Sequence, residues 1–313
     1  MDPNVSPDKI PPLITLLGPT AVGKTALAAR LAHAIGAEVI SADSRQVFRG
    51  MDIGTGKDKS DYLVDGLQVP VHLIDIADAG SEYSVYNFVT DFNRSYDDLR
   101  SRGKPAVLCG GTGLYLEAVL RGYDMVEVPE NETFRASLKD IPEETLLSLL
   151  EQKRKLHNTS DSLERSRLIR ALEIEQFKES RPKNRVATRL ETMPVFGLRF
   201  ERAAIRERIT QRLKTRLGTG LVLEVEALLH SGIPAGRLLY YGLEYKYVTQ
   251  YLLGDLREDQ MFRLLNTAIH QFAKRQMTWF RRMERSGIKI QWLEGENGAD
   301  RNLDIILAGI SNS

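Results

Sequence analysis

The sequence predicts an α/β fold in which a doubly wound parallel sheet carries an inserted helical lobe and a helical C-terminal part. Three observations support this prediction. A glycine-rich loop motif follows an apolar run near the N-terminus, strand and helix patterns alternate over about the first 120 residues, and the chain then turns polar and helical. We therefore expect an α/β core at residues 1–121, a helical insertion lobe at 122–191, and a return strand with C-terminal helices at 192–313.

The glycine-rich loop at residues 18–25 reads Gly-Pro-Thr-Ala-Val-Gly-Lys-Thr and matches the phosphate-loop pattern G-x-x-x-x-G-K-[ST] at every fixed position. An apolar run at 13–17 precedes it, as a buried strand would, and Leu27, Leu31 and Ala34 recur after it at helical spacing. Strand, glycine turn and helix in this order aim backbone N–H groups at an anion, as in NTPase-like folds. The residues predicted to bind a diphosphate or triphosphate are Gly18, Pro19, Thr20, Ala21, Val22, Gly23, Lys24 and Thr25.

Two residues of this loop carry specific chemistry. Lys24 would neutralise phosphate charge, and the Thr25 hydroxyl would ligate a Mg²⁺ ion that bridges phosphate oxygens. The motif itself identifies neither the phosphate compound nor the reaction.

The rest of the core follows in alternating order. Ser84 is predicted to cap a helix that Gly103 ends, and a second glycine turn at 110–113 leads into another helix. A glycine-rich loop is expected at 51–56. The predicted strands of this part are 38–41, 71–76 and 106–109.

The insertion and the C-terminal part read as mainly helical. The clearest helices of the insertion are 143–156 and 162–177. A strand at 194–199 is expected to rejoin the sheet, and a strand at 288–292 precedes a tail in which no pattern is evident. The predicted C-terminal helices are 203–217, 221–230, 244–253 and 258–283.

Composition excludes several classes of protein. The 313-residue chain has a net charge of only +1, so a nucleic-acid surface would have to be a local patch. Cys109 is the single cysteine, which excludes an internal disulfide and a zinc cluster and predicts a buried structural thiol. No apolar stretch approaches membrane-spanning length, and the N-terminus does not read as a signal peptide. We expect a cytoplasmic monomer with no membrane partner.

Two acids lie at the ends of predicted strands. Asp43 could orient an amine or hydroxyl and accept its proton, and a helix N-cap is an equally good interpretation. Asp75 could be a magnesium-ligating acid, although a strand-end turn is the better interpretation.

Basic residues gather in three segments, within 165–170, 206–216 and 274–285, and the last includes Trp279 and Phe280. A charged run is usually a solvated face, but three runs beside one phosphate loop favour contact with nucleic acid.

Five motifs in order resemble those of bacterial tRNA dimethylallyltransferases. They are Gly-Pro-Thr-Ala-x-Gly-Lys-Thr, Ile-Ser-Ala-Asp-Ser-Arg-Gln-Val, Met-Asp-Ile-Gly-Thr-Gly-Lys, Gly-Gly-Thr-Gly-Leu-Tyr and Ala-Lys-Arg-Gln-Met-Thr-Trp-Phe-Arg. The resemblance runs from Leu13 to Trp292. It implies a phosphate-loop α/β fold with a helical insertion. It also implies transfer of a dimethylallyl group from its diphosphate to the exocyclic amine of the adenosine just 3′ of the tRNA anticodon.

The resemblance assigns roles to particular residues. Lys24, Arg212 and Thr25, the last through Mg²⁺, would stabilise the leaving diphosphate of the prenyl donor. Asp43 would hydrogen-bond the adenine amine and take its proton, and Thr112 would lie near the reacting base. The residues implied to contact the anticodon stem-loop of tRNA are Asp43, Ser44, Arg45, Gln46, Thr112, Ser166, Arg167, Arg170, Lys246, Lys274, Arg275, Gln276, Trp279 and Arg281.

The chain departs from the family pattern at several positions. Phe48 stands where many relatives have tyrosine, and the insertion has 157–161 in place of a His-Pro-Asn-Asp segment. Residues 54–58 read Gly-Thr-Gly-Lys-Asp where relatives have Gly-Thr-Ala-Lys-Pro. In the family segment Gly-Leu-Gly-Tyr-Lys, Glu244 replaces the second glycine. These changes leave the diphosphate residues intact. They put the choice of tRNA in question and fit a diverged second copy.

Three other functions remain open from the sequence. A phosphate-loop kinase or NTPase would place ATP in the same loop. A prenyltransferase could use free AMP as its acceptor, but the insertion and the basic segment 274–281 favour tRNA. A tRNA-binding protein that has lost catalysis would still bind tRNA but would form no product.

Overall fold

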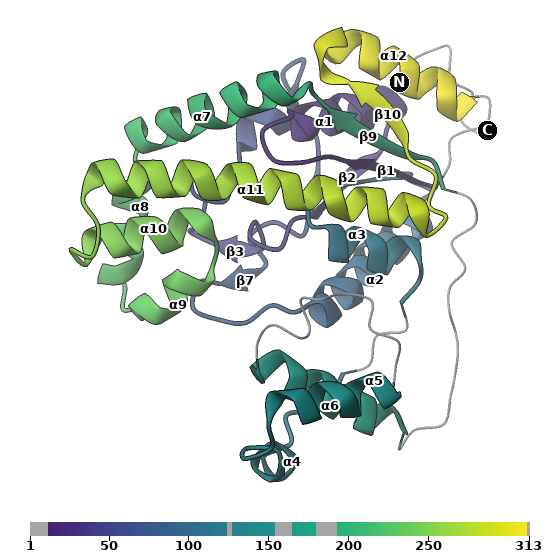
Figure 1. Ribbon diagram of the computed structural model, residues 1–313. Coiled ribbons are helices and arrows are strands. Elements are labelled where there is room, and N and C mark those ends of the chain that lie inside the picture. The colour runs from purple at the N-terminus through teal and green to yellow at the C-terminus, as the bar shows by residue number, and fades with distance from the viewer. Residues whose placement is uncertain (1–11, 124–126, 154–164, 180–192, 312–313) are drawn as a thin grey trace. The chain divides into compact units, whose positions relative to one another are not determined.

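Six parallel strands form the central sheet, in the order β10-β9-β1-β8-β2-β6. The computed structural model describes residues 12–123, 127–153, 165–179 and 193–311 (Figure 1). The non-consecutive order is that of a doubly wound sheet, so the predicted fold class is confirmed. The six strands are β1 (Leu13–Leu17), β2 (Glu38–Ala42), β6 (Val71–His72), β8 (Ala106–Gly110), β9 (Val195–Arg199) and β10 (Gln291–Glu294).

The chain divides into two compact units. The first consists of Met1–Tyr123 with Arg189–Ser313, and the second is Asp124–Thr188. The first unit also contains two separate two-stranded sheets: β3 (Phe48–Arg49) pairs with β7 (Ala77–Asp78), and β4 (Leu63–Val64) pairs with β5 (Leu67–Gln68). The expected boundary near residue 191 lies outside the described residues.

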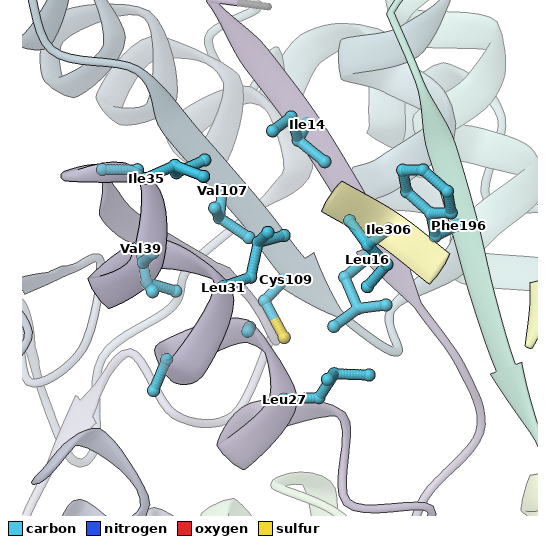
Figure 2. Close-up of a cluster of buried hydrophobic side chains, with 14 of the residues drawn as sticks. Ile14, Leu16, Leu27, Leu31, Ile35, Val39, Val107, Cys109, Phe196 and Ile306 are labelled. Atoms are coloured by element: carbon cyan, nitrogen blue, oxygen red, sulfur yellow. The ribbon is translucent and has the colours of Figure 1, made fainter. Parts of the chain in front are cut away.

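One face of the sheet packs against α1 (Lys24–Ile35) and α12 (Ala299–Ser311). Residues alternate between the faces of a strand, so Ile14 and Leu16 of β1 point to this side together. Figure 2 shows the resulting cluster, in which Leu27, Leu31 and Ile35 of α1 meet strand side chains and Ile306 of α12. Leu13 and Leu17 of β1 face the opposite side.

The opposite face packs against α2 (Val85–Ser101), α3 (Gly113–Leu120) and the end of α11 (Glu258–Arg285). The helix α2 begins where predicted, because Ser84 and Asn87 form a reciprocal capping box. The ring of Phe88 on α2 stacks on Tyr115 of α3, with centroids 4.1 Å apart. This stack joins the two helices over the sheet.

The long helix α11 also packs on a helical layer (Figure 1). Its buried residues recur every three or four positions from Met261 to Met283, which is the stripe that a helix turns toward a core. The helices of this layer are α7 (Arg202–Gly218), α8 (Leu221–His230), α9 (Ala235–Tyr240) and α10 (Leu243–Leu252).

The second unit contains α4 (Glu132–Ser137), α5 (Glu143–Lys153) and α6 (Arg165–Glu179). Leu146 and Leu150 of α5 pack on Leu168 and Leu172 of α6 in a small separate core. The predicted helices 143–156 and 162–177 correspond to α5 and α6, and their residues 154–156 and 162–164 lie outside the described part.

Several sequence predictions need correction. The strand expected at 71–76 ends at His72, because Leu73 and Asp75 have positive φ angles and residues 75–77 donate to Gln46 and Val47 instead. The strand expected at 288–292 is β10, shifted to Gln291–Glu294. The tail is not featureless, because it forms α12, whose apolar residues cover the sheet. The helix α9 was not predicted.

Candidate active site at the carboxyl edge of the sheet

Three glycine-rich or polar segments meet where the central strands end. Leu17, Gly110 and Ala42 stand in register across β1, β8 and β2. Gly110 is required here, because a Cβ atom would overlap the carbonyl oxygen of Ala42. The segments that follow these strands hold Gly18–Thr25, Asp43 and Thr112, so the sheet brings the predicted site residues to one edge.

The phosphate-loop motif forms the expected strand–turn–helix unit. The helix α1 begins at Lys24, directly after Gly23 in the left-handed region (φ 84°). The Arg208 Nε atom on α7 donates to the carbonyl oxygen of Ala21 at 2.9 Å, and this bond braces the loop from the helical layer. The loop is therefore held from both the sheet and α7.

The Lys24 ammonium group lies folded over its own loop. Its Nζ donates to the Pro19 carbonyl at 3.2 Å and would lie 3.5 Å from a Cβ atom on Gly111. Burial lowers the pKa of Lys24, while the nearby Cys109 and Asp43 act in the opposite direction. A bound anion would form an ion pair with this ammonium group. Cys109 itself is buried, and burial raises its pKa to about 12, so it is a structural thiol as predicted.

Asp43 shapes the turn after β2. Its Oδ1 accepts the backbone N–H groups of Arg45 at 2.9 Å and Gln46 at 3.4 Å. No helix starts here, so Asp43 caps a turn and not a helix. Among the described residues no hydrogen bond reaches its Oδ2 oxygen. One carboxylate oxygen is thus fixed by the backbone and the other is left to accept from a substrate.

Thr112 lies beside this turn. Its Oγ1 accepts the backbone N–H of Ser44 at 3.1 Å, and its backbone N–H donates to the Ala42 carbonyl at 3.3 Å. These bonds tie the second glycine turn to the segment that carries Asp43. The structure therefore places Asp43, Ser44 and Thr112 together.

Two glutamines act as internal clamps. The Gln276 Nε2 donates to the Gly111 carbonyl at 2.8 Å, and its Oε1 accepts from the Thr20 N–H at 2.9 Å. Gln46 Nε2 donates to the Gly56 carbonyl at 3.0 Å, and its Oε1 accepts from the Ser41 hydroxyl at 3.2 Å. Both side chains are buried, and their amide groups form hydrogen bonds with loops and strands of the protein itself. The sequence did not indicate this structural role.

The loop at 51–58 is held by charged residues from distant elements. The Glu224 carboxylate on α8 accepts the N–H groups of Asp52, Ile53 and Gly54 at 2.9, 2.6 and 3.0 Å, and also the Tyr245 hydroxyl at 2.7 Å. The Lys57 side chain is fully buried. Its Nζ forms an ion pair with Asp52 and donates to the Phe48 carbonyl. This framework fixes where residues 56–58 lie.

Asp75 belongs to the same framework. Its carboxylate contacts Lys57 Nζ at 2.6 Å and Lys59 Nζ at 3.0 Å. Burial alone would raise the pKa of Asp75, but the bonds from the two lysines outweigh burial and hold the pKa below its ordinary value. Asp75 is thus a turn residue paired with lysines, which favours the strand-end interpretation over a magnesium ligand.

A cavity of about 780 Å³ opens between α7 and the loop at 51–58, next to Ala21 of the phosphate loop. Its lining includes Ala21 of the loop and Arg208, Arg212 and Arg216, which stand four residues apart on one side of α7. Arg212 Nη2 binds Asp58 Oδ2 at 2.7 Å. The cavity therefore presents cations beside the loop that is predicted to bind phosphate.

The donor chemistry fits a magnesium ion carried by a diphosphate. No group of three or more His, Cys, Asp or Glu side chains in the described parts of the chain could hold a metal by itself. Mg²⁺ bound with phosphates typically keeps several waters and needs only one or two protein oxygens. The half-buried Thr25 at the start of α1 can supply such an oxygen.

The basic residues implied to contact tRNA differ in their environment. Arg45 is half-buried, with its guanidinium 5.7 Å from the ring centroid of exposed Tyr240. Trp279 donates to Glu117 Oε2 at 3.0 Å and packs against Gly113, so its indole N–H serves the junction of α11 and α3. Exposed side chains are found at Lys246, Lys274, Arg275 and Arg281.

The second unit holds the remaining predicted tRNA contacts. Ser166 and Arg167 are exposed on α6. Arg170 is instead bound within the unit, to Glu173 and to the Val128 carbonyl at 2.6 Å. Arg170 therefore has a structural role in addition to any contact with RNA.

Comparison with known proteins decides the family. Residues 46–283 match the IPP transferase family, and residues 12–68 match the isopentenyl transferase family. The chain belongs to the IPP transferase family. The resemblance and the predicted enzyme class, a prenyltransferase, are thereby confirmed. The structure also contains no helix, among its described residues, that is long and apolar enough to span a membrane.

Relatives of this IPP transferase share most of its length. A protein from Phocaeicola vulgatus named tRNA dimethylallyltransferase 2 is 53% identical, covering 90% of this chain and 92% of that protein. One from Syntrophotalea carbinolica with the same name is 54% identical, covering 90% and 94%. The crystal structure of the tRNA isopentenylpyrophosphate transferase of Bacillus halodurans matches with a TM-score of 0.68 and 30% identity, over 96% of both chains.

Proposed function

We propose that this chain transfers the dimethylallyl group of dimethylallyl diphosphate to the exocyclic amine of the adenosine 3′ of the anticodon in tRNA. The observation that carries the proposal is the meeting of two different chemistries at one sheet edge. Lys24 and the phosphate loop can hold a diphosphate, and Asp43 with Thr112 can receive an amine. Names of close relatives support this substrate pair over ATP or AMP.

The donor half of the reaction rests on positive charge. The C1–O bond of the donor breaks as diphosphate leaves with the bonding electrons, and negative charge grows on the leaving oxygens. Lys24, the loop N–H groups and Arg212 stabilise that charge in place. Mg²⁺, held by Thr25 and the diphosphate, would supply further neutralisation when bound. Arg212 reaches the diphosphate by exchanging its bond with Asp58.

The acceptor half rests on Asp43. The adenine amine nitrogen forms the new bond to C1 and loses one proton, which the free oxygen of Asp43 accepts. The two backbone bonds to Oδ1 keep this carboxylate in one orientation. Thr112, anchored to Ser44, borders the place where the base would lie.

Transfer to tRNA requires the base to leave its stack and enter the site. Arg45 and the exposed basic residues of α11, together with Lys246, supply charge for the anticodon stem-loop. Exposed Ser166 and Arg167 of the second unit would add contacts. We expect the enzyme to act as a cytoplasmic monomer, and size-exclusion chromatography with light scattering would test the oligomeric state.

Product analysis tests the proposal. The purified protein is incubated with dimethylallyl diphosphate, Mg²⁺ and unmodified tRNA, with parallel reactions that replace tRNA by AMP or the donor by ATP. Nuclease digestion and mass spectrometry should find dimethylallyladenosine only in the tRNA reaction, at the position 3′ of the anticodon. Product from AMP, or consumption of ATP without prenyl transfer, would contradict the proposal.

A further inference from the structure

Arg216 lies one helical turn beyond Arg212 on α7 and lines the same cavity. Its side chain is 13% exposed, and its Nη2 atom is buried with no hydrogen-bond partner among the described residues. A buried guanidinium nitrogen without an acceptor is unfavourable, because folding has removed its water and supplied nothing in return. The Nη2 donor of Arg216 therefore lacks an acceptor within the described part of the chain.

The nearest acid only partly balances Arg216. Glu244 Oε1 lies 3.7 Å from Arg216 Nη1, which is an ion-pair distance but too long for a good hydrogen bond. Burial raises the pKa of Glu244 and, together with the charge of Arg212, lowers the pKa of Arg216. Two guanidinium groups thus lie close together, Arg212 bound to Asp58 and Arg216 only loosely paired with Glu244.

Gly56 makes room for this arrangement. A Cβ atom on Gly56 would overlap the Arg216 guanidinium and lie 2.6 Å from Arg212 Nη2. Gly56 also has a φ of 70°, where a side chain is strained. Three positions at which the chain departs from the family pattern, Gly56, Asp58 and Glu244, therefore surround the same pair of arginines.

We propose that Arg216 is an additional diphosphate-binding residue, whose guanidinium turns its unpartnered donor to the departing diphosphate beside Arg212 while Glu244 stays as its ion-pair partner. The inference rests on the proposed function, since it assigns the ligand of the cavity to the prenyl donor. A diphosphate suits the site chemically, because its several oxygens can accept from two guanidinium groups at once. The departures at Gly56 and Glu244 then form one coordinated change in the donor site.

Binding of inorganic pyrophosphate with Mg²⁺, measured by titration calorimetry, tests the role of Arg216. Arg216→Met removes the charge and keeps a side chain of similar length, and is expected to weaken binding by about ten- to a hundredfold. Arg216→Lys, which keeps the charge, should lose less than about fivefold. Lys214→Met is the matched control, because Lys214 is exposed on the same helix. It should change binding by less than about twofold.

A double variant separates ligand binding from a structural role. If Arg216 served only to neutralise Glu244, then Arg216→Met with Glu244→Gln would restore pyrophosphate affinity, and that result would overturn the inference. We expect the double variant to melt near the wild-type temperature and still bind weakly. Equal binding by wild type and Arg216→Met would also overturn it while leaving the proposed function standing. Failure of the wild type to bind pyrophosphate would instead contradict the proposed donor site.

Discussion

The side-chain oxygen of Gln276 accepts the backbone N–H of Thr20 at 2.9 Å, across 256 positions of sequence. The same amide donates to Gly111, so one residue of α11 joins the phosphate loop to the second glycine turn. The long helix therefore reaches the site directly. Its exposed basic residues and its buried clamp belong to one rigid element.

Gln276→Ala should weaken donor binding more than tRNA binding. The change leaves the Thr20 N–H and the Gly111 carbonyl without their partner, which costs about 1–3 kcal/mol and loosens both turns. We expect pyrophosphate affinity to fall about tenfold, while tRNA affinity measured by filter binding changes by less than about threefold. The opposite pattern would show that Gln276 acts mainly on tRNA.

Glu224→Ala should destabilise the loop at 51–58. The carboxylate accepts three backbone N–H groups and the Tyr245 hydroxyl, and these donors would lose their acceptor together. The expected loss is about 2–4 kcal/mol in the free energy of unfolding, measured with urea. Glu226→Ala is the control, because Glu226 is exposed on the same helix. A loss no larger than in this control would refute the anchoring role.

Glu38 should make stability depend on pH in acid. Its hydrogen bond from Arg102, aided by His72 and Lys104, outweighs desolvation and holds the pKa of Glu38 at about 2, below the ordinary 4.5. A lowered pKa gives stability that is complete above about pH 4.5 and is lost as pH falls toward about 2.

Glu38→Gln tests this dependence through urea unfolding at several pH values. The variant should be about 1–3 kcal/mol less stable than wild type at pH 7, and the difference should shrink as pH is lowered below about 4.5. Exposed Glu226→Gln should show no such dependence. A difference that stays constant down to about pH 3 would contradict the assigned pKa.

Asp58→Asn should tighten donor binding slightly. The Arg212–Asp58 pair at 2.7 Å must open before Arg212 reaches a diphosphate, and Asp58 is 50% exposed, so the pair is weak. Removing the charge should lower the KM for dimethylallyl diphosphate about two- to fivefold with little change in kcat. A raised KM would show that Asp58 helps to hold the donor.

The sequence predicted the central strands because they are short apolar runs followed by glycine or polar residues, as at 13–17 and 106–109. It misplaced the last strand because Ile288 and Ile290 extend the apolar pattern before pairing begins at Gln291. The strand at 71–76 failed because backbone turns at Leu73 and Asp75 leave no periodic signal. The helix α12 was missed because its polar start hides the apolar face that includes Ile306.

Site prediction followed the same division. Lys24 and Asp43 could be named because each lies in a local motif after a predicted strand, whereas Thr112 was named only through the family resemblance. The clamps of Gln46 and Gln276 and the anchor of Glu224 could not, because their partners are backbone groups brought close only by the fold. In the sequence, a buried glutamine cannot be distinguished from an exposed one. The pairing of Arg216 with Glu244 has the same origin.

Single-turnover transfer of radiolabelled dimethylallyl to tRNA tests the central claim most directly, with wild type compared to Asp43→Asn. Asparagine keeps the acceptor oxygen for the turn but cannot take the amine proton, so the rate should fall by about 10²–10⁴-fold while tRNA and pyrophosphate binding remain. A wild-type rate in Asp43→Asn, with label on the same adenosine, would contradict the role of Asp43 and the account of this site.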